Sequence, residues 1–435
     1  MQEVQLTSGR YGHMLNSAQV FSPDDQWVVY DTRNDQTHIG RTCCIEKVNI
    51  RTGEIVRLYT TAGQTIHGPG VGAVAFHPLK DRMIFIHGLT NCDEENPYGF
   101  TRRFGAILNE QDPGVISHAE ARSISGPLVP GALRGGTHAH SWSGDGEWIS
   151  FTYNDWLMEK QEQVNPDSKD LRTIGVMAPV KQVTLAEETA ENFSGQYFTV
   201  VVATVTETPA AGSDEVEKAL DECWVGKNGY DKKDGAHQRR AIAFQGIVRV
   251  KDGSPLTEVF VSDIPDDVTH AAPGQTLEGT LTTRPTVPLG VVQRRVTFTD
   301  RRKFPGVQGP RFWLRSAPDG ARIYFLMKDD NGIVQLYEVP TNGGEIRQVT
   351  ELESSIQAQF NISPDGKSVA FICDNSIWIT DIRTGVSRRI TVRTSDDQAP
   401  VLTVVWDHAG NALVYNRYQT TDDGRYLQIF RILLN

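Results

Sequence analysis

The feature that most constrains this chain is a recurring motif of an apolar strand, a Ser-Pro-Asp-Gly type of turn and a second apolar strand. Six copies are recognisable, at residues 18–35, 74–88, 140–155, 314–332, 360–375 and 404–416. Gly and Asp readily adopt the positive φ angles that tight hairpin turns require. The repeat therefore predicts a series of antiparallel hairpins, one in each structural unit.

A second segment, a short strand with a threonine at or near its end, closes most of these units. It occurs at residues 3–7, 181–185, 294–298, 347–351 and 388–392. Units of roughly 40 residues with four short strands each are typical of β-propeller blades. The chain is therefore predicted to be an all-β propeller.

Seven blades are expected if residues 194–299 form one unit with insertions, its strands lying at 197–205, 241–246, 257–265 and 291–298. The expected blades span 12–61, 67–124, 137–186, 194–299, 311–351, 356–393 and 400–435. The last unit has only three strands, so residues 2–7 are predicted to complete it, which closes the ring and removes exposed sheet edges. One helix is expected, at 213–226, with Asp214 as its cap and Glu217 at the capping-box position.

Composition limits the possible partners and compartments. The net charge of -11 argues against a nucleic-acid surface, and no apolar run is long enough to span a membrane. The five scattered cysteines predict neither a disulfide framework nor a zinc site, which favours a reducing compartment. The first residues do not resemble a signal peptide, so a cytoplasmic protein is expected, although a chain that had lost a leader would equally suit the periplasm.

Strand direction predicts which residues share a face of the ring. First strands begin, and second strands end, at the face opposite the Ser-Pro-Asp-Gly turns. The residues expected there are His13, His67, His138, His140, Arg311 and Gln357 before first strands, and Asp31, His87, Asp155, Asp329 and Asp330 after second strands. Loops 88–103 and 156–171 open on the same face, whereas the insertions 205–239 and 263–292 are expected on the opposite face.

His138 and His140 are separated by one residue, so their side chains are predicted to project from one side of a strand. A third ligand from a neighbouring blade, such as His67, would complete a site for a divalent cation: Mn, Fe, Ni or Zn. The alternative is that both histidines are polar residues that form hydrogen bonds in the channel. Gly135 and Gly136, just before them, would let the backbone approach a ligand closely.

Three further residues are candidates for holding a ligand at this mouth. His87 ends a second strand, and Arg102, with its neighbour Arg103, lies in a rim loop where it could hold a carboxylate through paired hydrogen bonds. Arg134 precedes the glycine pair. No nucleophile elbow, P-loop, dinucleotide-binding fingerprint or H-E-x-x-H motif occurs.

The segments LRGGTHAHSWSGDGEWISFTYND, 290–299 and 329–337 resemble the bacterial YidR family of TolB-type propellers. That resemblance covers almost the whole chain and implies a TolB/WD40-like propeller fold. No particular activity follows from this resemblance.

A weaker resemblance is to oligogalacturonate lyase, a seven-bladed propeller that uses a divalent metal to cleave uronate oligomers by β-elimination. QLTSGRYGHMLNSAQVFSPDDQWVVYD is similar to its first blade, and Thr-His138-Ala-His140 is similar to its metal segment. The lyase has a glutamine three residues before the first of these histidines, where this chain has Gly135, so His67 or Gln357 would have to substitute. The resemblance implies His13 or His67 as the base and Arg134, Arg102 or Arg311 as carboxylate clamps.

The leading prediction is therefore a metal-dependent enzyme that acts on sugar-acid-containing oligosaccharides by elimination, with no nucleic-acid or membrane partner. One alternative is a non-catalytic propeller that binds a protein or glycan. Another is a glycoside hydrolase that uses paired carboxylates among Asp31, Asp155 and Asp329. The sequence leaves the oligomeric state and the identities of substrate and metal open.

Overall fold

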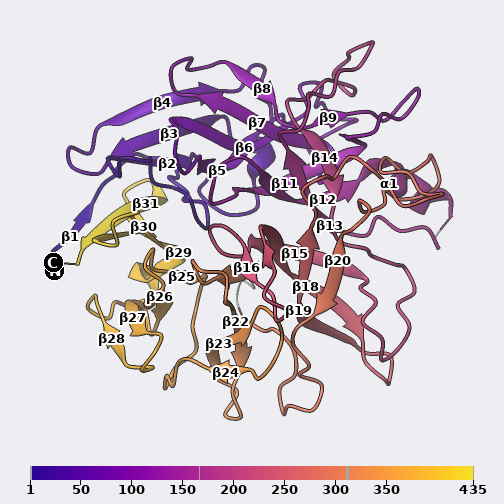
Figure 1. Cartoon of the computed structure of the whole chain (residues 1–435). Helices are drawn as coiled ribbons and strands as arrows, with labels where there is room; N and C mark the ends of the chain where they lie inside the picture. The colour runs from indigo at the N-terminus through magenta and orange to yellow at the C-terminus, as the bar shows by residue number, and fades with distance from the viewer. Residues whose placement is uncertain (1, 166, 310–312, 435) are drawn as a thin grey trace.

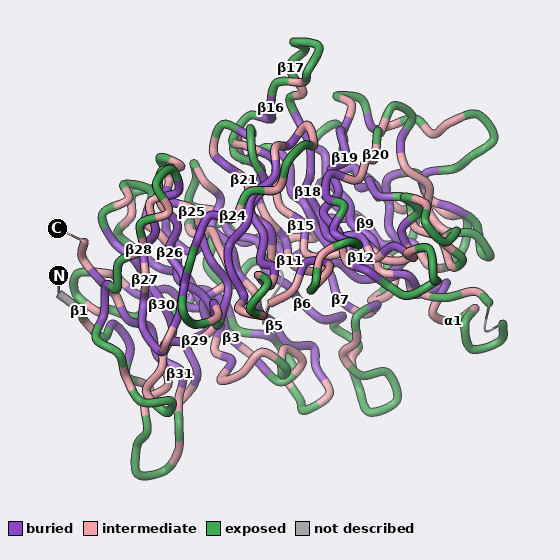
Figure 2. Tube along the Cα trace, turned by 90° about the horizontal axis from the view of Figure 1, so that it is seen from below, coloured by how far each residue is buried: buried purple, intermediate pink, exposed green. Residues whose placement is uncertain are grey.

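The computed structural model describes residues 2–165, 167–309 and 313–434, which form a ring of antiparallel sheets around a central axis (Figure 1). The buried strands make up the body of the ring, and exposed loops cover its two faces (Figure 2). Apolar side chains of neighbouring blades pack together, as Val29 of blade one does with Phe85 of blade two. The predicted seven-bladed propeller is confirmed.

The blades follow one another in chain order. Blade one contains β2 (Trp27–Asp31), β3 (Cys44–Asn49) and β4 (Ile55–Thr60), and blade two contains β5 (Val71–Phe76), β6 (Arg82–Gly88), β7 (Arg103–Asn109) and β8 (Ile116–His118). Blade three contains β11 (Gly135–Trp142), β12 (Ile149–Asp155), β13 (Thr173–Ala178) and β14 (Phe198–Val201). Blade four contains β15 (Lys218–Trp224), β18 (Arg240–Arg249), β19 (Pro255–Ile264) and β20 (Val292–Arg295).

Blade five contains β21 (Arg315–Ser316), β22 (Arg322–Lys328), β23 (Val334–Pro340) and β24 (Arg347–Gln348). Blade six contains β25 (Asn361–Ile362), β26 (Ser368–Cys373), β27 (Ser376–Asp381) and β28 (Ser387–Arg389). Blade seven contains β29 (Pro400–Trp406), β30 (Ala412–Thr421), β31 (Gly424–Leu433) and β1 (Gln2–Gln5). The inner edge of blade one pairs through isolated bridges, such as Met14 with Asp31.

The remaining elements are short. They are η1 (Ile39–Arg41), β9 (Ala121–Arg122), β10 (Ala132–Leu133), α1 (Trp156–Val164), β16 (Tyr230–Asp231), β17 (His237–Gln238) and η2 (Asp396–Gln398). The β16–β17 hairpin projects from one face of the ring, and α1 lies at the other (Figure 2). No helix within the described residues is long and apolar enough to cross a membrane.

The repeated turn is held by a serine and an aspartate two residues later. In blade three, Ser143 Oγ donates to Asp145 Oδ1 at 2.5 Å and accepts from Trp148 N at 3.0 Å. Ser363 and Asp365 repeat this arrangement in blade six. Because the bonds are local, the turn chemistry that is visible in the sequence directly specifies each hairpin.

The N-terminal strand closes the ring as predicted. β1 pairs antiparallel with β31, with Gln5 opposite Phe430, and therefore forms the outer edge of the last blade. Leu6, just beyond β1, is buried in the core that blades one and seven share. The first and last segments of the chain thus complete one sheet.

Two secondary-structure assignments made from the sequence are wrong. Residues 198–201 pair with β13 as the outer strand of blade three, whereas they were expected to begin blade four. The predicted helix at 213–226 contains β15, the inner strand of blade four. Positions 216, 219, 222 and 225 are buried, because a bulge between Leu220 and Cys223 breaks the strand alternation and produces a spacing that resembles a helix.

Two local expectations also need correction. Residues 181–185, which were predicted as the outer strand of blade three, make only a single bridge, between Val183 and Gly195. The adjacent residues Cys43 and Cys44 are joined by a disulfide, although no disulfide framework was expected. Because this bond joins neighbours in the sequence, it crosslinks no distant parts of the ring.

Candidate functional site

The H-x-H segment contains a bulge, and this changes where its two histidines point. Ala139 has a φ of +58°, and the pairing of β11 with β12 shifts register between His138 and Ser141. Side chains therefore do not alternate regularly between the two sides of the strand here, and the rings of His138 and His140 lie in different surroundings. His138 is half-buried, whereas His140 is 1% exposed.

The same bulge recurs in other blades. Ala73 of β5, Asp221 of β15 and Leu402 of β29 also have positive φ, and each lies at a register shift of an inner strand. The bulge at Ala139 is therefore a repeated element of the propeller and is not specific to the segment that carries the two histidines.

His140 belongs to a buried hydrogen-bond chain. Its Nε2 lies 2.9 Å from Thr137 Oγ1, which donates to Glu120 Oε1 at 2.5 Å, and Glu120 also accepts from Gly105 N. Since the threonine proton is given to Glu120, His140 donates from Nε2 and its Nδ1 is left without a partner. Burial lowers the pKa of His140 to about 3, so the ring is neutral.

The predicted metal ligands do not converge. Within residues 2–165, 167–309 and 313–434, no three His, Cys, Asp or Glu side chains form a group that could hold a metal ion. His67 lies in a surface loop, and the Gln357 amide is paired with Asn375 at 3.1 and 2.9 Å. The described residues therefore do not fit the manganese-type centre that the resemblance implied, and we assign no chemical step to a metal.

The two histidines predicted near strand ends lie in the packed interior. His13 is fully buried against the ring of Tyr11, with centroids 4.4 Å apart, and burial lowers its pKa to about 4. His87 bonds Tyr59 Oη at 2.9 Å, and burial again lowers its pKa to about 4. Neither ring is exposed to solvent, so neither is placed to take a proton from a ligand at the channel mouth.

Arg134 and Asp155 do meet, but in a different role from the one predicted. Arg134 Nε donates to Asp155 Oδ2 at 2.8 Å, and its other nitrogens donate to the carbonyls of Thr280 and Thr283. Asp155 also caps helix α1 by accepting from the amides of residues 157 and 158. All of these groups are engaged within the protein, so Arg134 is not a free carboxylate clamp.

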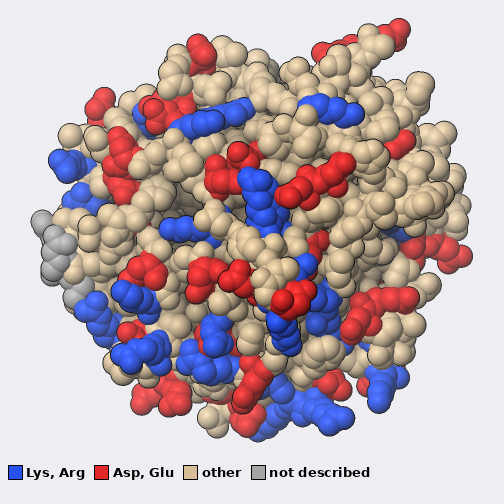
Figure 3. Space-filling model, viewed as in Figure 1, with Lys and Arg blue, Asp and Glu red and all other residues tan. Residues whose placement is uncertain are grey.

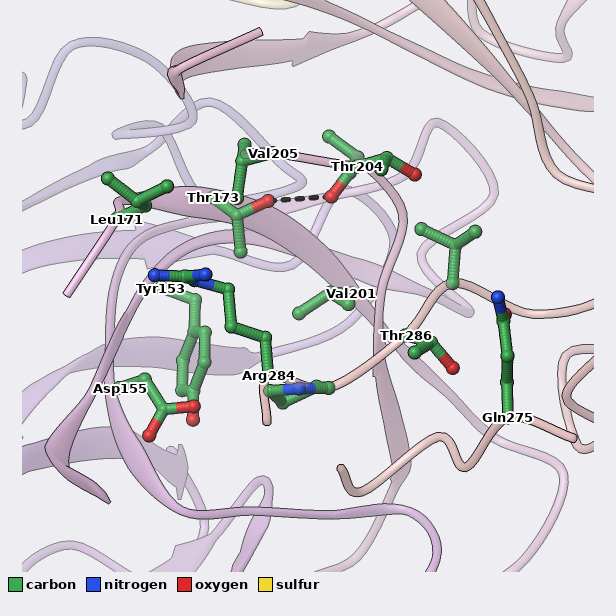
Figure 4. Close-up of a pocket in the computed structure, with 13 residues that line it drawn as sticks. Tyr153, Asp155, Leu171, Thr173, Val201, Thr204, Val205, Gln275, Arg284 and Thr286 are labelled. Atoms are coloured by element: carbon green, nitrogen blue, oxygen red, sulfur yellow. Dashed lines mark hydrogen bonds between the residues drawn. The ribbon is translucent and has the colours of Figure 1, made fainter. Parts of the chain in front are cut away.

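The insertion that leaves blade four between β19 and β20 reaches these residues and roofs a pocket of about 290 Å³ (Figure 4). Tyr153, Asp155 and Arg284 lie on one side of this strand-end pocket and Gln275 on the other (Figure 4). The sequence predicted that the insertion 263–292 lies only on the face that carries the Ser-Pro-Asp-Gly turns. The insertion does leave β19 at that face, but its tip folds back over the ends of the strands of blade three.

The other predicted carboxylates and arginines are also engaged locally. Asp31 pairs with Arg33 at 2.7 Å, Asp329 accepts from two nearby amides, and Arg102 pairs with Glu191. Asp31, Asp155 and Asp329 therefore each already have partners within the protein. Arg311 lies outside the described residues.

The structure reveals a cluster that the sequence reasoning did not assemble. Phe100 is 58% exposed, and around its ring lie the guanidinium carbons of Arg103 at 4.9 Å and Arg172 at 5.4 Å, and the His138 ring at 6.4 Å. We call these four residues the Phe100 cluster. Phe100 comes from the loop before β7, Arg103 from the start of β7, Arg172 from the position before β13, and His138 from β11.

Arg103 is the decisive member of the Phe100 cluster. It is 2% exposed, its Nη1 donates to Tyr98 Oη at 3.1 Å, and its Nε and Nη2 have no hydrogen-bond partner. Burial and the charge of Arg103 lower the pKa of Arg172, and burial and both arginines hold the pKa of His138 well below its usual range. The cluster is therefore a site of positive potential with unused donors, which suits an anion.

The loop that carries Phe100 is held by close backbone packing. A Cβ on Gly136 would lie 2.2 Å from the Phe100 carbonyl oxygen, so only glycine fits there. Arg122 Nη1 donates to the carbonyls of Thr101 at 2.9 Å and Gly135 at 2.6 Å. Gly136 thus admits a protein loop and not a ligand, and it positions the Phe100 cluster indirectly.

Part of the Phe100 cluster could have been found from the sequence. Arg172 immediately precedes the third strand of blade three, so the strand-direction rule places it on the same face as His138. The rule does not tell which of Arg102 and Arg103 is paired.

The face of the ring opposite the Phe100 cluster is shown in Figure 3. Acidic and basic side chains are intermixed there, so no continuous field of one sign appears on that face.

Comparison with known proteins agrees with this fold. The family model described as "Protein of unknown function (DUF3748)" matches residues 70–193. Among solved structures, an oligogalacturonate lyase in complex with manganese has a TM-score of 0.53 at 10% identity and covers 100% of this chain and 93% of that one. A puromycin-hydrolysing peptidase of Mycobacterium tuberculosis has a TM-score of 0.51 at 14% identity, over 98% of this chain and 54% of that one.

These identities are low, so both structures support the propeller architecture alone. The sequence relationship is much stronger for the uncharacterized protein YidR of Escherichia coli (strain K12), which is 40% identical over 391 residues. The match covers 89% of this chain and 88% of that relative. The chain therefore belongs to the YidR family.

Proposed function

We propose that the protein binds a carboxylate-bearing sugar, of the uronate type, at the Phe100 cluster. The observation that carries this proposal is the buried Arg103 guanidinium, which has two unpartnered nitrogens beside an exposed aromatic ring. An arginine with free donors matches a carboxylate, and the apolar face of a sugar ring stacks on an aromatic side chain. Both features of a sugar acid are thus met within one cluster.

A second candidate function is β-elimination at the same cluster. His138 is neutral, and its buried Nδ1 has no hydrogen-bond partner, so this nitrogen is the candidate proton acceptor. Two arginines that neutralise a uronate carboxylate would make the hydrogen on the adjacent carbon more acidic, so that His138 could remove it as the glycosidic oxygen leaves. Ultraviolet absorbance of the unsaturated product during incubation with trigalacturonate tests this reaction, and its absence with wild-type protein would leave binding alone.

Isothermal titration calorimetry with galacturonate, trigalacturonate and the neutral sugar galactose tests binding. We expect the uronates to bind and galactose to bind at least about tenfold more weakly, because hydrogen bonds to charged groups contribute about 1.5–3 kcal/mol. Arg103→Met and Arg172→Met should each weaken uronate binding by a similar factor. Equal affinity for galactose, or unchanged uronate binding in Arg103→Met, would contradict the proposal.

Arg102→Met is the matched control. Arg102 is the sequence neighbour of Arg103, but its guanidinium is already paired with Glu191 and Asn91. The variant should therefore bind uronates as the wild type does. Unchanged melting temperatures would show that the Arg103 and Arg172 variants remain folded.

A further inference from the structure

A second cavity, with several polar side chains in its lining, lies in the channel, on the inner side of the strand that carries His138. Its volume is about 210 Å³, and its lining includes His140, Glu222, Trp224, Trp313 and Arg315. These residues come from β11 of blade three, β15 of blade four, and β21 of blade five with the segment before it. We call this space the channel cavity.

Glu222 reaches the channel cavity because of the bulge at Asp221, which has a φ of +53°. The carboxyl is 4% exposed, and Oε2 accepts from Thr152 Oγ1 at 2.7 Å. Oε1 has no hydrogen-bond partner, and neither has Nδ1 of His140, which lines the same cavity. Two buried polar atoms in one cavity without partners in the protein can be satisfied there by water or by a bound ligand.

The surroundings of Glu222 keep its carboxyl protonated at neutral pH. Burial raises the pKa to about 8, with the neighbouring Asp221 adding to the shift and Thr152 and Arg172 opposing it. Cys223 beside it and the half-buried Arg315 also line this space. Because Oε2 accepts from Thr152, the acid proton lies on Oε1, the oxygen without a partner.

Arg172 connects the Phe100 cluster to the strand that carries Glu222, since its guanidinium packs on Phe100 and its carbonyl accepts from the amide of Ala219 in β15 at 3.0 Å. We infer that the channel cavity is a second subsite, where protonated Glu222 donates a hydrogen bond to a hydroxyl or ring oxygen of the sugar that follows the uronate. This inference rests on the proposed function, and it extends the ligand from a single sugar acid to an oligomer.

The pH dependence of binding tests this inference. Trigalacturonate and galacturonate are titrated into wild-type protein at several values from about pH 6 to about pH 9.5, a range in which the ligand carboxylates stay ionised. Wild-type affinity for trigalacturonate should fall by at least about tenfold, because ionised Glu222 loses its donor and repels an anionic ligand. Affinity for galacturonate, which occupies the Phe100 cluster alone, should change much less.

Glu222→Gln should make trigalacturonate binding nearly independent of pH, because the amide keeps a donor and cannot ionise. Glu120→Gln is the matched control. Glu120 is also fully buried with a raised pKa, of about 7, but it bonds Thr137 and the Gly105 amide and does not line the channel cavity. This variant should keep the wild-type profile.

Failure of the inference and failure of the proposed function give different results. If uronates bind but the wild type shows no pH dependence, or Glu222→Gln follows the wild-type profile, the second subsite is wrong and the Phe100 cluster stands. If no uronate binds at any pH, both are wrong. Infrared difference spectra of wild type and Glu222→Gln at about pH 6.5 provide a readout without ligand, and lack of a protonated-carboxyl band would overturn the role of Glu222.

Discussion

Arg122 and Arg103 are both buried arginines, but the protein uses them differently. Arg122 donates to the carbonyls of Thr101, Gly135 and Glu191 and to the Glu191 carboxylate, so its charge holds loops together. Arg103 has one protein partner and two nitrogens without any. A buried charge without a partner is costly, which is why we assign Arg103 to ligand binding and Arg122 to structure.

Ala139 in β11 has a left-handed backbone conformation, which gives a prediction about stability. This conformation costs an L-residue roughly 1–2 kcal/mol of folding free energy. Glycine avoids that cost but loses roughly 0.5–1 kcal/mol through its larger backbone entropy in the unfolded chain. Ala139→Gly should therefore stabilise the protein by up to about 1 kcal/mol, and Ala139→Val should destabilise it by at least about 1 kcal/mol. Urea denaturation measures both changes.

Ala75→Gly provides the contrast, because Ala75 lies in the inner strand of blade two just beyond its bulge and is not among the residues with positive φ. Glycine should destabilise the protein there. If both glycine variants were destabilising, the bulge at Ala139 would not have the geometry described.

At the scale of elements, the position of the insertion between β19 and β20 of blade four depends on residues of another blade. Arg134 ties the tip of the insertion, at Thr280 and Thr283, to Asp155 at the end of β12. Local sequence predicts only where the insertion leaves its blade. Where its tip lies is decided by this buried ion pair on another blade.

Removing Arg134 should therefore have two effects. Arg134→Leu leaves the Asp155 carboxyl buried without its cation, and should cost about 3–5 kcal/mol of unfolding free energy. It should also make residues 275–287 susceptible to limited proteolysis under native conditions. Urea denaturation and mass spectrometry of the fragments measure these effects.

Arg10→Leu is the control, because the pair of Arg10 with Asp423 is exposed and such pairs contribute at most about 1 kcal/mol. A small effect of Arg134→Leu, similar to that of Arg10→Leu, would show that the anchor does not hold the insertion.

At the scale of the whole molecule, closure of the ring by β1 links the two ends of the chain. A variant that lacks residues 1–7 exposes the edge of β31 and removes Leu6 from the core between blades one and seven. We expect a lower melting temperature and a tendency to aggregate, because an exposed strand edge pairs with other chains. Differential scanning calorimetry and light scattering measure these changes.

A synthetic peptide of residues 1–8 should restore the melting temperature in a concentration-dependent way, since it binds only the folded ring. The same peptide with Leu6→Asp should fail, because the charge would enter the apolar core. Equal rescue by both peptides would contradict closure through this strand.

Buried titratable groups predict an optimum in the pH dependence of stability. Burial lowers the pKa of His13, His77 and His87 to about 4 and that of His140 to about 3. The unfolded chain binds protons at these histidines first, near its own pKa of 6.5, so stability falls as pH decreases from about 6.5 towards 4.

The buried carboxyls of Glu120 and Glu222 act in the opposite direction. Their pKa values are raised to about 7 and about 8, so the unfolded chain loses these protons first and stability falls as pH rises from about 4.5 towards 8. The pKa is also lowered for His118 and His138 and raised for Asp155, Asp170 and Asp407, so six histidines oppose five carboxyls, and we expect maximal stability at about pH 6 to 7. Urea denaturation across this pH range tests this expectation. In Glu222→Gln the free energy of unfolding should fall less than in the wild type as pH rises above the optimum.

The sequence alone determined the architecture, because the signals for it are local. Ser-Pro-Asp-Gly turns and alternating strands specify hairpins without reference to the rest of the chain. Six such hairpins and the unit at 194–299 predicted seven blades, and the three-stranded last unit predicted the closing role of residues 2–7. The local signal failed where a bulge interrupted the alternation. This explains why β15 resembled a helix and why His138 and His140 were expected to point the same way.

Only the tertiary structure decided the composition of the candidate site. Whether Arg102 or Arg103 is paired depends on Glu191, which lies 89 positions from Arg102 in the chain, and Phe100 meets Arg172 only because two blades are adjacent. Burial and charge pairing are set by neighbours from other blades. Residue type and strand direction could therefore place candidates on one face, but which donors stay unused was settled only when the blades packed together.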